Sequence, residues 1–128
     1  MINLVEQEEE TSNKEAQTVF VYGYEIKEQP VPLQEIWEEE KKVVIQGTIF
    51  QLEEKSLKTG STLFQATVTD YTDSLTVKIF AKTKEDVKIL QQLEKGMWIR
   101  ARGKVEVDRF LPDNELVMLS SDLNEITS

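Results

Sequence analysis

The side chains of this sequence that could do chemistry are aromatic and basic, because the usual catalytic and metal-binding types are missing. Histidine and cysteine do not occur, so histidine-based triads, histidine-ligated zinc and thiolate metal sites are impossible. Asp70 and Asp73 could form a carboxylate pair, but they fall in a short polar stretch typical of a turn. The glutamates at 38–40 would fan around a helix rather than converge on a metal ion. We therefore expect no catalytic residue, no metal site and no cofactor.

The remaining candidate chemistry is the binding of single-stranded nucleic acid. Aromatic rings stack on bases, and basic side chains contact phosphates. The residues that we expect to do this are Phe50, Lys55, Lys58, Lys78, Phe80, Arg109 and Phe110. Tyr71 is a further candidate for stacking. The alternatives are that each ring packs against the N-terminal segment or a helix, and that each basic side chain is simply solvated.

Two alternating runs must position these residues. In the first run the alternating apolar residues are Phe64, Ala66 and Val68, and in the second they are Leu75, Val77 and Ile79. A period of two places apolar and polar side chains on opposite faces of a strand. The link at 70–74 is rich in residues that favour turns, which predicts a hairpin. One face should be buried, and the other should be an open platform of Gln, Thr, Lys and Phe.

Three more strands and a helix complete the expected core. A strand is predicted over 41–54, and Gly47 in its middle predicts a bend or bulge. A flexible loop with two lysines is expected at 55–61. Thr83 is suited to cap a helix whose apolar stripe is Val87, Leu90 and Leu93. The last strands are predicted at 97–107 and 115–120, separated by a loop.

The N-terminal part differs in composition from this core. Residues 1–29 are predicted to be an acidic lead-in and flanking strand, the tail of a preceding domain, and 30–128 to be the main domain. Within the first part, 18–26 favours a strand or clamp packed on that domain. Residues 33–40 fit a short helix with Leu33, Ile36 and Trp37 on one side.

Three strands, a helix and two strands, with a bend in the first strand, are the order of an OB-fold. We therefore predict a mainly β domain, a five-stranded Greek-key barrel with one helix between strands 3 and 4, plus an N-terminal β and helical extension. OB-folds bind oligonucleotides across strands two and three and between the neighbouring loops. The candidate residues above would lie on the face of strands 1–3 and in those loops.

The distribution of charge limits how strongly such a face can bind nucleic acid. The net charge is −9, yet residues 41–107 carry 12 basic and 8 acidic side chains between acidic flanks. A mildly basic core of this kind favours weak binding, which the acidic lead-in should weaken further. No apolar run approaches the roughly 18–20 residues that span a bilayer. We expect a monomeric segment in the cytoplasm that does not bind membranes.

Four segments carry a resemblance to a known family. They are 43–50, 68–80, 84–86 and 95–103, which holds the run Gly-Met-Trp. Over residues 30–126 the chain resembles the OB domain of the PolC-type DNA polymerase III alpha subunit, the replicative polymerase of low-GC Gram-positive bacteria. This implies that the parent is a DNA-directed DNA polymerase with 3′–5′ exonuclease activity, none of whose catalytic motifs occurs here. The implied partners are single-stranded DNA and other domains of that polymerase.

A second hypothesis is that the chain is a docking module. The predicted outward row of the fourth strand is Trp98, Arg100, Arg102 and Lys104. Tryptophan and arginine are common anchors in protein interfaces, and the resemblance implies a neighbouring polymerase domain or a holoenzyme protein as the partner. Alternatively, Trp98 packs on the flank of the barrel while the basic side chains contact the acidic lead-in.

Overall fold

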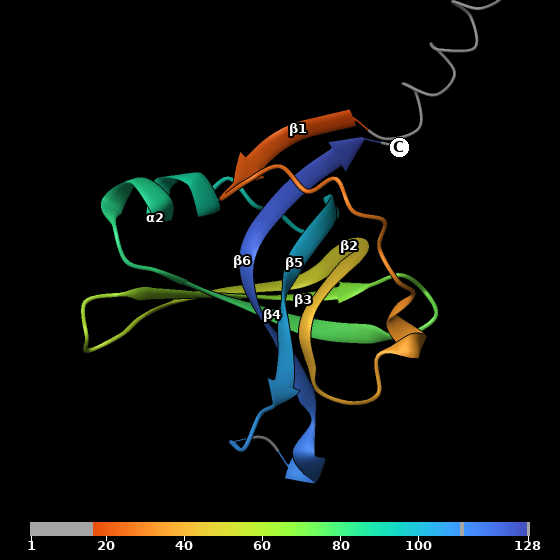
Figure 1. Ribbon diagram of the computed structural model, residues 1–128. Coiled ribbons are helices and arrows are strands. Elements are labelled where there is room, and N and C mark those ends of the chain that lie inside the picture. The colour runs from red at the N-terminus through yellow and green to blue at the C-terminus, as the bar shows by residue number, and fades with distance from the viewer. Residues whose placement is uncertain (1–16, 111, 128) are drawn as a thin grey trace, which may run out of the picture.

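The computed structural model describes residues 17–110 and 112–127. Its elements in order are β1 (Gln17–Tyr22), the 3-10 helix η1 (Leu33–Glu35), β2 (Glu40–Ser56), β3 (Thr62–Thr69), β4 (Ser74–Ala81), the α-helix α2 (Lys84–Leu90), β5 (Trp98–Val107), the 3-10 turn η2 (Pro112–Asn114) and β6 (Leu116–Thr127) (Figure 1). Among these residues no helix is long and apolar enough to cross a membrane. The predicted order of three strands, a helix and two strands is confirmed.

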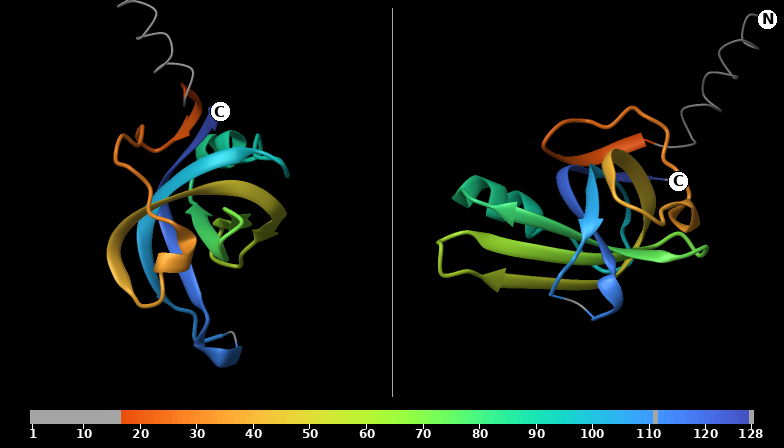
Figure 2. Two further views of the ribbon diagram at one scale, coloured as in Figure 1. Left: turned by 90° about the vertical axis from the view of Figure 1, so that its right-hand side faces the viewer. Right: turned by 60° about the horizontal axis from the view of Figure 1, so that its bottom comes forward.

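Five of the strands close into a ring. β2 pairs with β3, β3 with β4, β6 with β5 and β5 with β2, all antiparallel, while β4 and β6 pair in parallel. The two views in Figure 2 show the strongly curved β2 taking part in both halves of this ring. Gly47 lies where β2 approaches β3: a Cβ there would stand 2.5 Å from the carbonyl oxygen of Thr69. A side chain at this position would therefore clash with β3, and the register shifts of β2 lie on either side of the glycine, between 40 and 43 and between 49 and 51.

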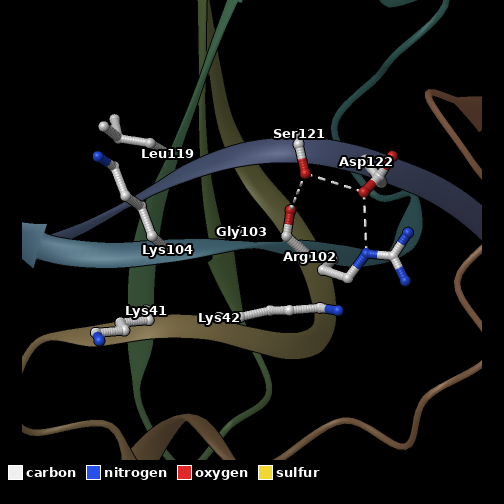
Figure 3. Close-up of a pocket in the computed structure, with 8 residues that line it drawn as sticks. All are labelled: Lys41, Lys42, Arg102, Gly103, Lys104, Leu119, Ser121 and Asp122. Carbon is white, nitrogen blue, oxygen red and sulfur yellow. Dashed lines mark hydrogen bonds and ion pairs between the residues drawn. The ribbon is translucent and has the colours of Figure 1, made fainter.

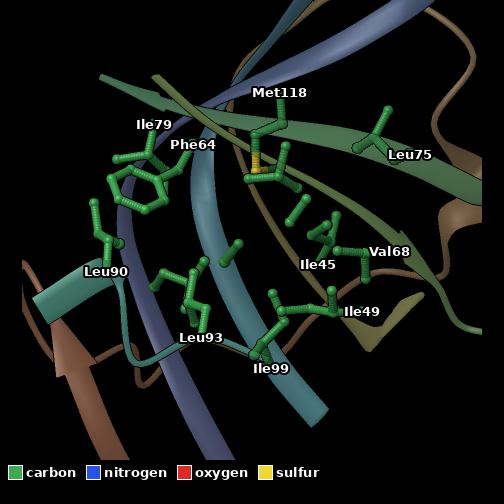
Figure 4. Close-up of a cluster of buried hydrophobic side chains, with 14 of the residues drawn as sticks. Ile45, Ile49, Phe64, Val68, Leu75, Ile79, Leu90, Leu93, Ile99 and Met118 are labelled. Atoms are coloured by element: carbon green, nitrogen blue, oxygen red, sulfur yellow. The ribbon is translucent and has the colours of Figure 1, made fainter. Parts of the chain in front are cut away.

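The centre of the ring is filled by the apolar residues that alternate along the strands. All six inward residues predicted for the hairpin are buried, and Val68 and Val77 have no exposed surface. Leu90 and Leu93 pack against Phe64 and Ile79 from the side of α2 (Figure 4). The helix begins as predicted, because the Thr83 side chain accepts a hydrogen bond of 3.0 Å from the backbone N–H of Asp86.

The predicted helix at 33–40 is wrong, since only Leu33–Glu35 forms a short 3-10 turn. Some backbone donors of this stretch bond to the barrel, whereas the N–H groups of Glu35 and Ile36 close the 3-10 turn onto Pro32 and Leu33. The N–H of Val31 donates to the carbonyl oxygen of Val44, and the N–H of Leu33 donates to Asp70 Oδ2 at 2.8 Å. Leu33 is buried as expected, but Trp37 is exposed. The segment is a strap across the hairpin turn rather than a helix.

The last strand runs further than the sequence suggested, to Thr127. Asp122 and Asn124 interrupt its apolar pattern, yet both are buried. They are satisfied by the N-terminal segment, because Tyr24 N–H donates to Asp122 Oδ1 at 2.8 Å and Ile26 N–H donates to Asn124 Oδ1 at 2.7 Å. Just before this segment, β1 pairs antiparallel with β6. Residues 18–26 therefore pack on the barrel as predicted, although Tyr24 is exposed. Residues 1–16 of the predicted lead-in lie outside the described residues, and the boundary at 29 stays a prediction.

Candidate nucleic-acid interface

The outer face of β2, β3 and β4 is ordered in rows by the pairing of these strands. One row joins Gln51, Thr67 and Thr76, the next joins Glu53, Gln65 and Lys78, and the third joins Lys55, Leu63 and Phe80. Paired residues of this kind share a face. The predicted open platform of Gln, Thr, Lys and Phe is confirmed for β3 and β4.

A bulge in β2 changes which of its residues belong to this face. The register shifts between Ile49 and Gln51, so that two residues of β2 stand opposite one of β3. Beyond the bulge the outward side chains are Gln51, Glu53 and Lys55. An uninterrupted alternation from Phe50 would have turned these three inward. The bulge therefore places a glutamate in the middle of the predicted binding face.

The loop between β5 and β6 closes one side of this face. A hollow of about 430 Å³ is lined by the polar rows of the three strands together with Asp108, Phe110 and Glu115 of the loop. An adjoining hollow of similar volume holds Phe80, Arg109 and Phe110. The ring of Phe80 is 44% exposed and that of Phe110 is 93% exposed, so both can meet a ligand. The structure thus brings Lys78, Phe80, Arg109 and Phe110 together.

Phe50 lies apart from this group. It lines a separate hollow with Tyr71 and the residues of the β3–β4 turn, at the other end of the hairpin from Phe80. Tyr71 has a positive φ of 71°, and its N–H donates to the Thr69 hydroxyl at 3.0 Å. Both rings are exposed. Lys58 is exposed in the loop that joins β2 to β3.

The two lysines of the face already have carboxylate partners. Lys78 Nζ lies 3.0 Å from Asp108 Oδ2, and both side chains are largely shielded from solvent. The other oxygen of Asp108 accepts the N–H of Phe110 at 2.9 Å. The pKa of Asp108 is held below its ordinary value, mainly by this hydrogen bond from Phe110 and to a lesser extent by the one from Lys78. Lys55 pairs with Glu53 at 3.7 Å in an exposed setting.

The basic residues of the proposed docking row are also engaged within the chain. Arg100 donates two hydrogen bonds to Gln46 Oε1, at 2.9 and 2.7 Å. Arg102 donates from Nε to Asp122 at 2.9 Å and from Nη1 to Glu28 at 2.7 Å. Lys104 pairs with Glu106 at 3.5 Å. Trp98 is half-buried. Figure 3 shows Arg102 and Asp122 beside a hollow of about 540 Å³, whose rim also carries Lys41 and Lys42.

Two features of the face have no signal in the sequence. The partner of Lys78 lies thirty residues further along the chain, and no local pattern links the two. No glycine marks the bulge at Phe50, so the alternation of the sequence could not predict that Glu53 faces outward. Within the described residues, no three acidic side chains gather in a way that could hold a metal ion. The expected lack of a cofactor stays a prediction.

Comparison with known proteins agrees with the topology and with the resemblance. Residues 43–126 match the family model described as an OB-fold nucleic acid binding domain. The chain is 46% identical over 120 residues to the PolC-type DNA polymerase III of Halalkalibacterium halodurans, covering 94% of this chain and 8% of that protein. The corresponding polymerase of Bacillus subtilis is 40% identical over 129 residues, covering 98% of this chain and 9% of that protein. The chain therefore spans less than a tenth of the length of these relatives.

A solved structure supports the same fold. Part of the aspartyl tRNA synthetase from Entamoeba histolytica superposes with a TM-score of 0.61 at 12% sequence identity, over 74% of this chain and 20% of that one. At this identity the likeness concerns the fold alone. The predicted Greek-key barrel is confirmed by the strand ring and by the family model together. The chain belongs to the family of OB-fold nucleic acid binding domains.

Proposed function

We propose that this chain is the OB module of a PolC-type DNA polymerase III and that it binds single-stranded DNA weakly across the outer face of β2, β3 and β4. The observation that carries the proposal is the cross-strand register, which sets a polar strip beside two exposed rings, Phe80 and Phe110. Catalysis would belong to other parts of the parent polymerase.

The face offers both kinds of contact that single strands need. Bases would stack on Phe80 and Phe110, each stacked base contributing about 1–3 kcal/mol. Gln65, Thr67 and Thr76 would donate or accept hydrogen bonds along the strip. Phosphates would contact Arg109 and the lysines of the face once these exchange their carboxylate partners. Phe50 and Tyr71 would take a base at the far end of the hairpin.

The charges explain why such binding would be weak. Lys55 and Lys78 are paired with Glu53 and Asp108, and Glu115 adds a further negative charge to the same hollow. A phosphate must therefore compete with a carboxylate at each lysine. Weak binding is still useful in a domain tethered to a polymerase, because the tether keeps the effective DNA concentration high.

The docking role has less support from the contacts. Arg100 and Arg102 are bonded within the chain, and Trp98 is half-buried. An interface on this row would have to break the bonds that hold Glu28 and Asp122 in place.

An NMR titration of the chain with an oligothymidine tests the proposed face. We expect the amide shifts of β3, of β4 and of the 108–115 loop to move most, with Phe80 and Phe110 among them. The amide shifts of the β5 row, which is Trp98, Arg100, Arg102 and Lys104, should not move. Shifts confined to Trp98 and its neighbours on β5, with the hairpin unmoved, would contradict the proposal.

A further inference from the structure

A further hollow lies at the end of the barrel, between the start of β3, the end of β4 and the helix α2. Its volume is about 500 Å³, and its lining includes Thr62, Lys82, Thr83, Lys84, Val87 and Lys88. In Figures 1 and 2 the helix lies over the same end of the barrel as the loop that joins β2 to β3. The sequence pattern did not single out these three lysines as ligands.

The helix places its basic side chains on one face. Lys84, Val87 and Lys88 are three and four residues apart, so they share the side of α2 that faces the hollow. Lys82 comes two residues after Phe80, directly beyond the end of β4. At about 3.3 Å per residue of extended chain, the two lie some 7 Å apart along the backbone. The hollow therefore lies directly beyond Phe80 in the direction of β4.

The lysines of this hollow differ from those of the face in having no carboxylate partner among the residues that the structure describes. None of the described residues that line the hollow is acidic. Nor does an ion pair join Lys82, Lys84 or Lys88 to any residue within 17–110 and 112–127. Glu54 comes near, but it accepts a hydrogen bond from Gln91 at 3.1 Å at the rim of the hollow.

Other groups in the hollow suit a phosphodiester. The Thr83 oxygen accepts the Asp86 N–H at the helix start, so its own O–H can still donate to a phosphate oxygen. Val87 is half-buried and gives an apolar surface on which a sugar can pack. Ammonium groups on flexible stems bind phosphate as point charges. The site therefore combines charge, a hydroxyl donor and an apolar surface.

We propose that this hollow binds the phosphates of single-stranded nucleic acid that leaves the barrel face past Phe80. The inference rests on the proposed function and extends its track beyond the hairpin onto α2. Among the described residues no ion pair has to be broken at this hollow, so a phosphate does not compete with a paired carboxylate for these ammonium groups. The hollow would supply most of the salt-dependent part of the affinity, while the aromatic face supplies stacking.

The test compares two double variants of equal charge change. K84Q/K88Q removes two lysines of the hollow, and K41Q/K42Q removes two from the hollow beside Arg102. The probe is a labelled oligothymidine of about 16 nucleotides, the upper site size of an OB-fold, measured by fluorescence anisotropy at several salt concentrations. We expect K84Q/K88Q to flatten the log–log salt slope by about 1.4, at 0.7 per cation. K41Q/K42Q should keep the slope of the unaltered chain.

Each other outcome has a definite meaning. An unchanged slope in K84Q/K88Q, or an equal loss in both double variants, overturns the site. A flattened slope in K84Q/K88Q with an F80A variant that binds normally supports the hollow but contradicts the aromatic face. If the unaltered chain does not bind the probe, both proposals fail. If an oligoglutamate of equal charge moves the NMR signals of 82–88 and the oligothymidine does not, the hollow is a peptide site and the inference is wrong.

Discussion

The two groups of basic residues on this barrel differ in what already surrounds them. Arg100, Arg102 and Lys104 on β5 each have a partner within the chain. Lys82, Lys84 and Lys88 around α2 have no ion-pair partner among the described residues. The first group ties the N-terminal segment and neighbouring strands together, whereas the second is available to a ligand. A count of positive charges would treat both groups alike.

The difference follows from the topology of the barrel. β5 lies between β2 and β6, and its outward residues stand directly opposite theirs: Arg100 faces Gln46, and Arg102 faces Asp122. Side chains at paired positions are close enough to bond. Lys82, Lys84 and Lys88 lie in the loop and helix that follow β4 and not within a paired strand, so they have no such cross-strand neighbour. Pairing across strands therefore holds Arg100 and Arg102 in contacts within the chain.

The largest expected effect is on stability, from removing the carboxylate that holds Arg102. Asp122→Ala leaves a largely buried guanidinium without this partner and the N–H of Tyr24 without an acceptor. Breaking a buried pair in this way costs several kcal/mol, and we expect a loss of about 3 kcal/mol in the free energy of unfolding. Urea denaturation measures it. Asp122→Asn, which keeps an acceptor for Tyr24, should lose less. A variant within about 0.5 kcal/mol of the unaltered chain would contradict the structural role.

The next effect is on affinity and concerns the aromatic side of the face. Phe80→Ala removes a stacking surface, so the binding free energy for an oligothymidine should weaken by about 1–3 kcal/mol at every salt concentration. Trp98→Ala is the matched control on β5 and should leave affinity unchanged. Fluorescence anisotropy decides between them. Loss of binding in Trp98→Ala with normal binding in Phe80→Ala means that the wrong face has been assigned.

The parts of this molecule that follow local patterns could be predicted from the sequence. The period of two from Phe64 to Ile79 predicted the hairpin, and Thr83 predicted the helix start, because both depend on neighbouring residues. The row of β5 was also predicted to face outward, but its bonds to Gln46 and Asp122 were not, since strand register sets them.

The remaining features depend on contacts between distant segments. Asp122 and Asn124 lay beyond the predicted end of the last strand at residue 120, and their burial is made favourable by hydrogen bonds from the N-terminal segment. Trp37 followed a helical pattern that the strap does not continue beyond Glu35, since Leu33 and Gln34 donate their N–H groups to the distant hairpin turn. The sequence pattern did not mark Lys84 and Lys88 as ligands. What distinguishes them is that none of the described residues lining their hollow is acidic.

A smaller effect concerns the carboxylate that competes for Lys78. Asp108→Asn removes that competitor, so phosphate should bind Lys78 more readily. We expect affinity for oligothymidine to rise at least about twofold to fivefold at low salt, because even an exposed charge pair contributes that much and the Lys78–Asp108 pair is largely shielded. The gain should fade as salt rises. Asp113→Asn, in the same loop, changes the charge equally without touching Lys78. An equal gain in both variants would mean that loop charge, not the Lys78 pair, sets the affinity.

The smallest effect, and the one that separates the two groups of cations most directly, is on the pH dependence of stability. Burial acts to raise the pKa of Asp122, but hydrogen bonds from Tyr24 N–H, Ser121 and Arg102 outweigh it and hold this pKa below its ordinary value of 3.8. A carboxyl with a lower pKa in the folded state binds fewer protons there than in the unfolded state.

Its contribution to stability is therefore fully present above the ordinary pKa and is lost as pH falls through the lowered value. We expect the stability gap between the unaltered chain and Asp122→Asn to shrink as pH is lowered from about 5 to about 3, as followed by urea denaturation at each pH. In the described part of the chain no ion pair joins the lysines around α2 to a carboxylate, so the gap between the unaltered chain and K84Q/K88Q should stay constant over the same range. A gap that shrinks for K84Q/K88Q as well would show that those lysines are paired after all, and the contrast between the two groups would fail.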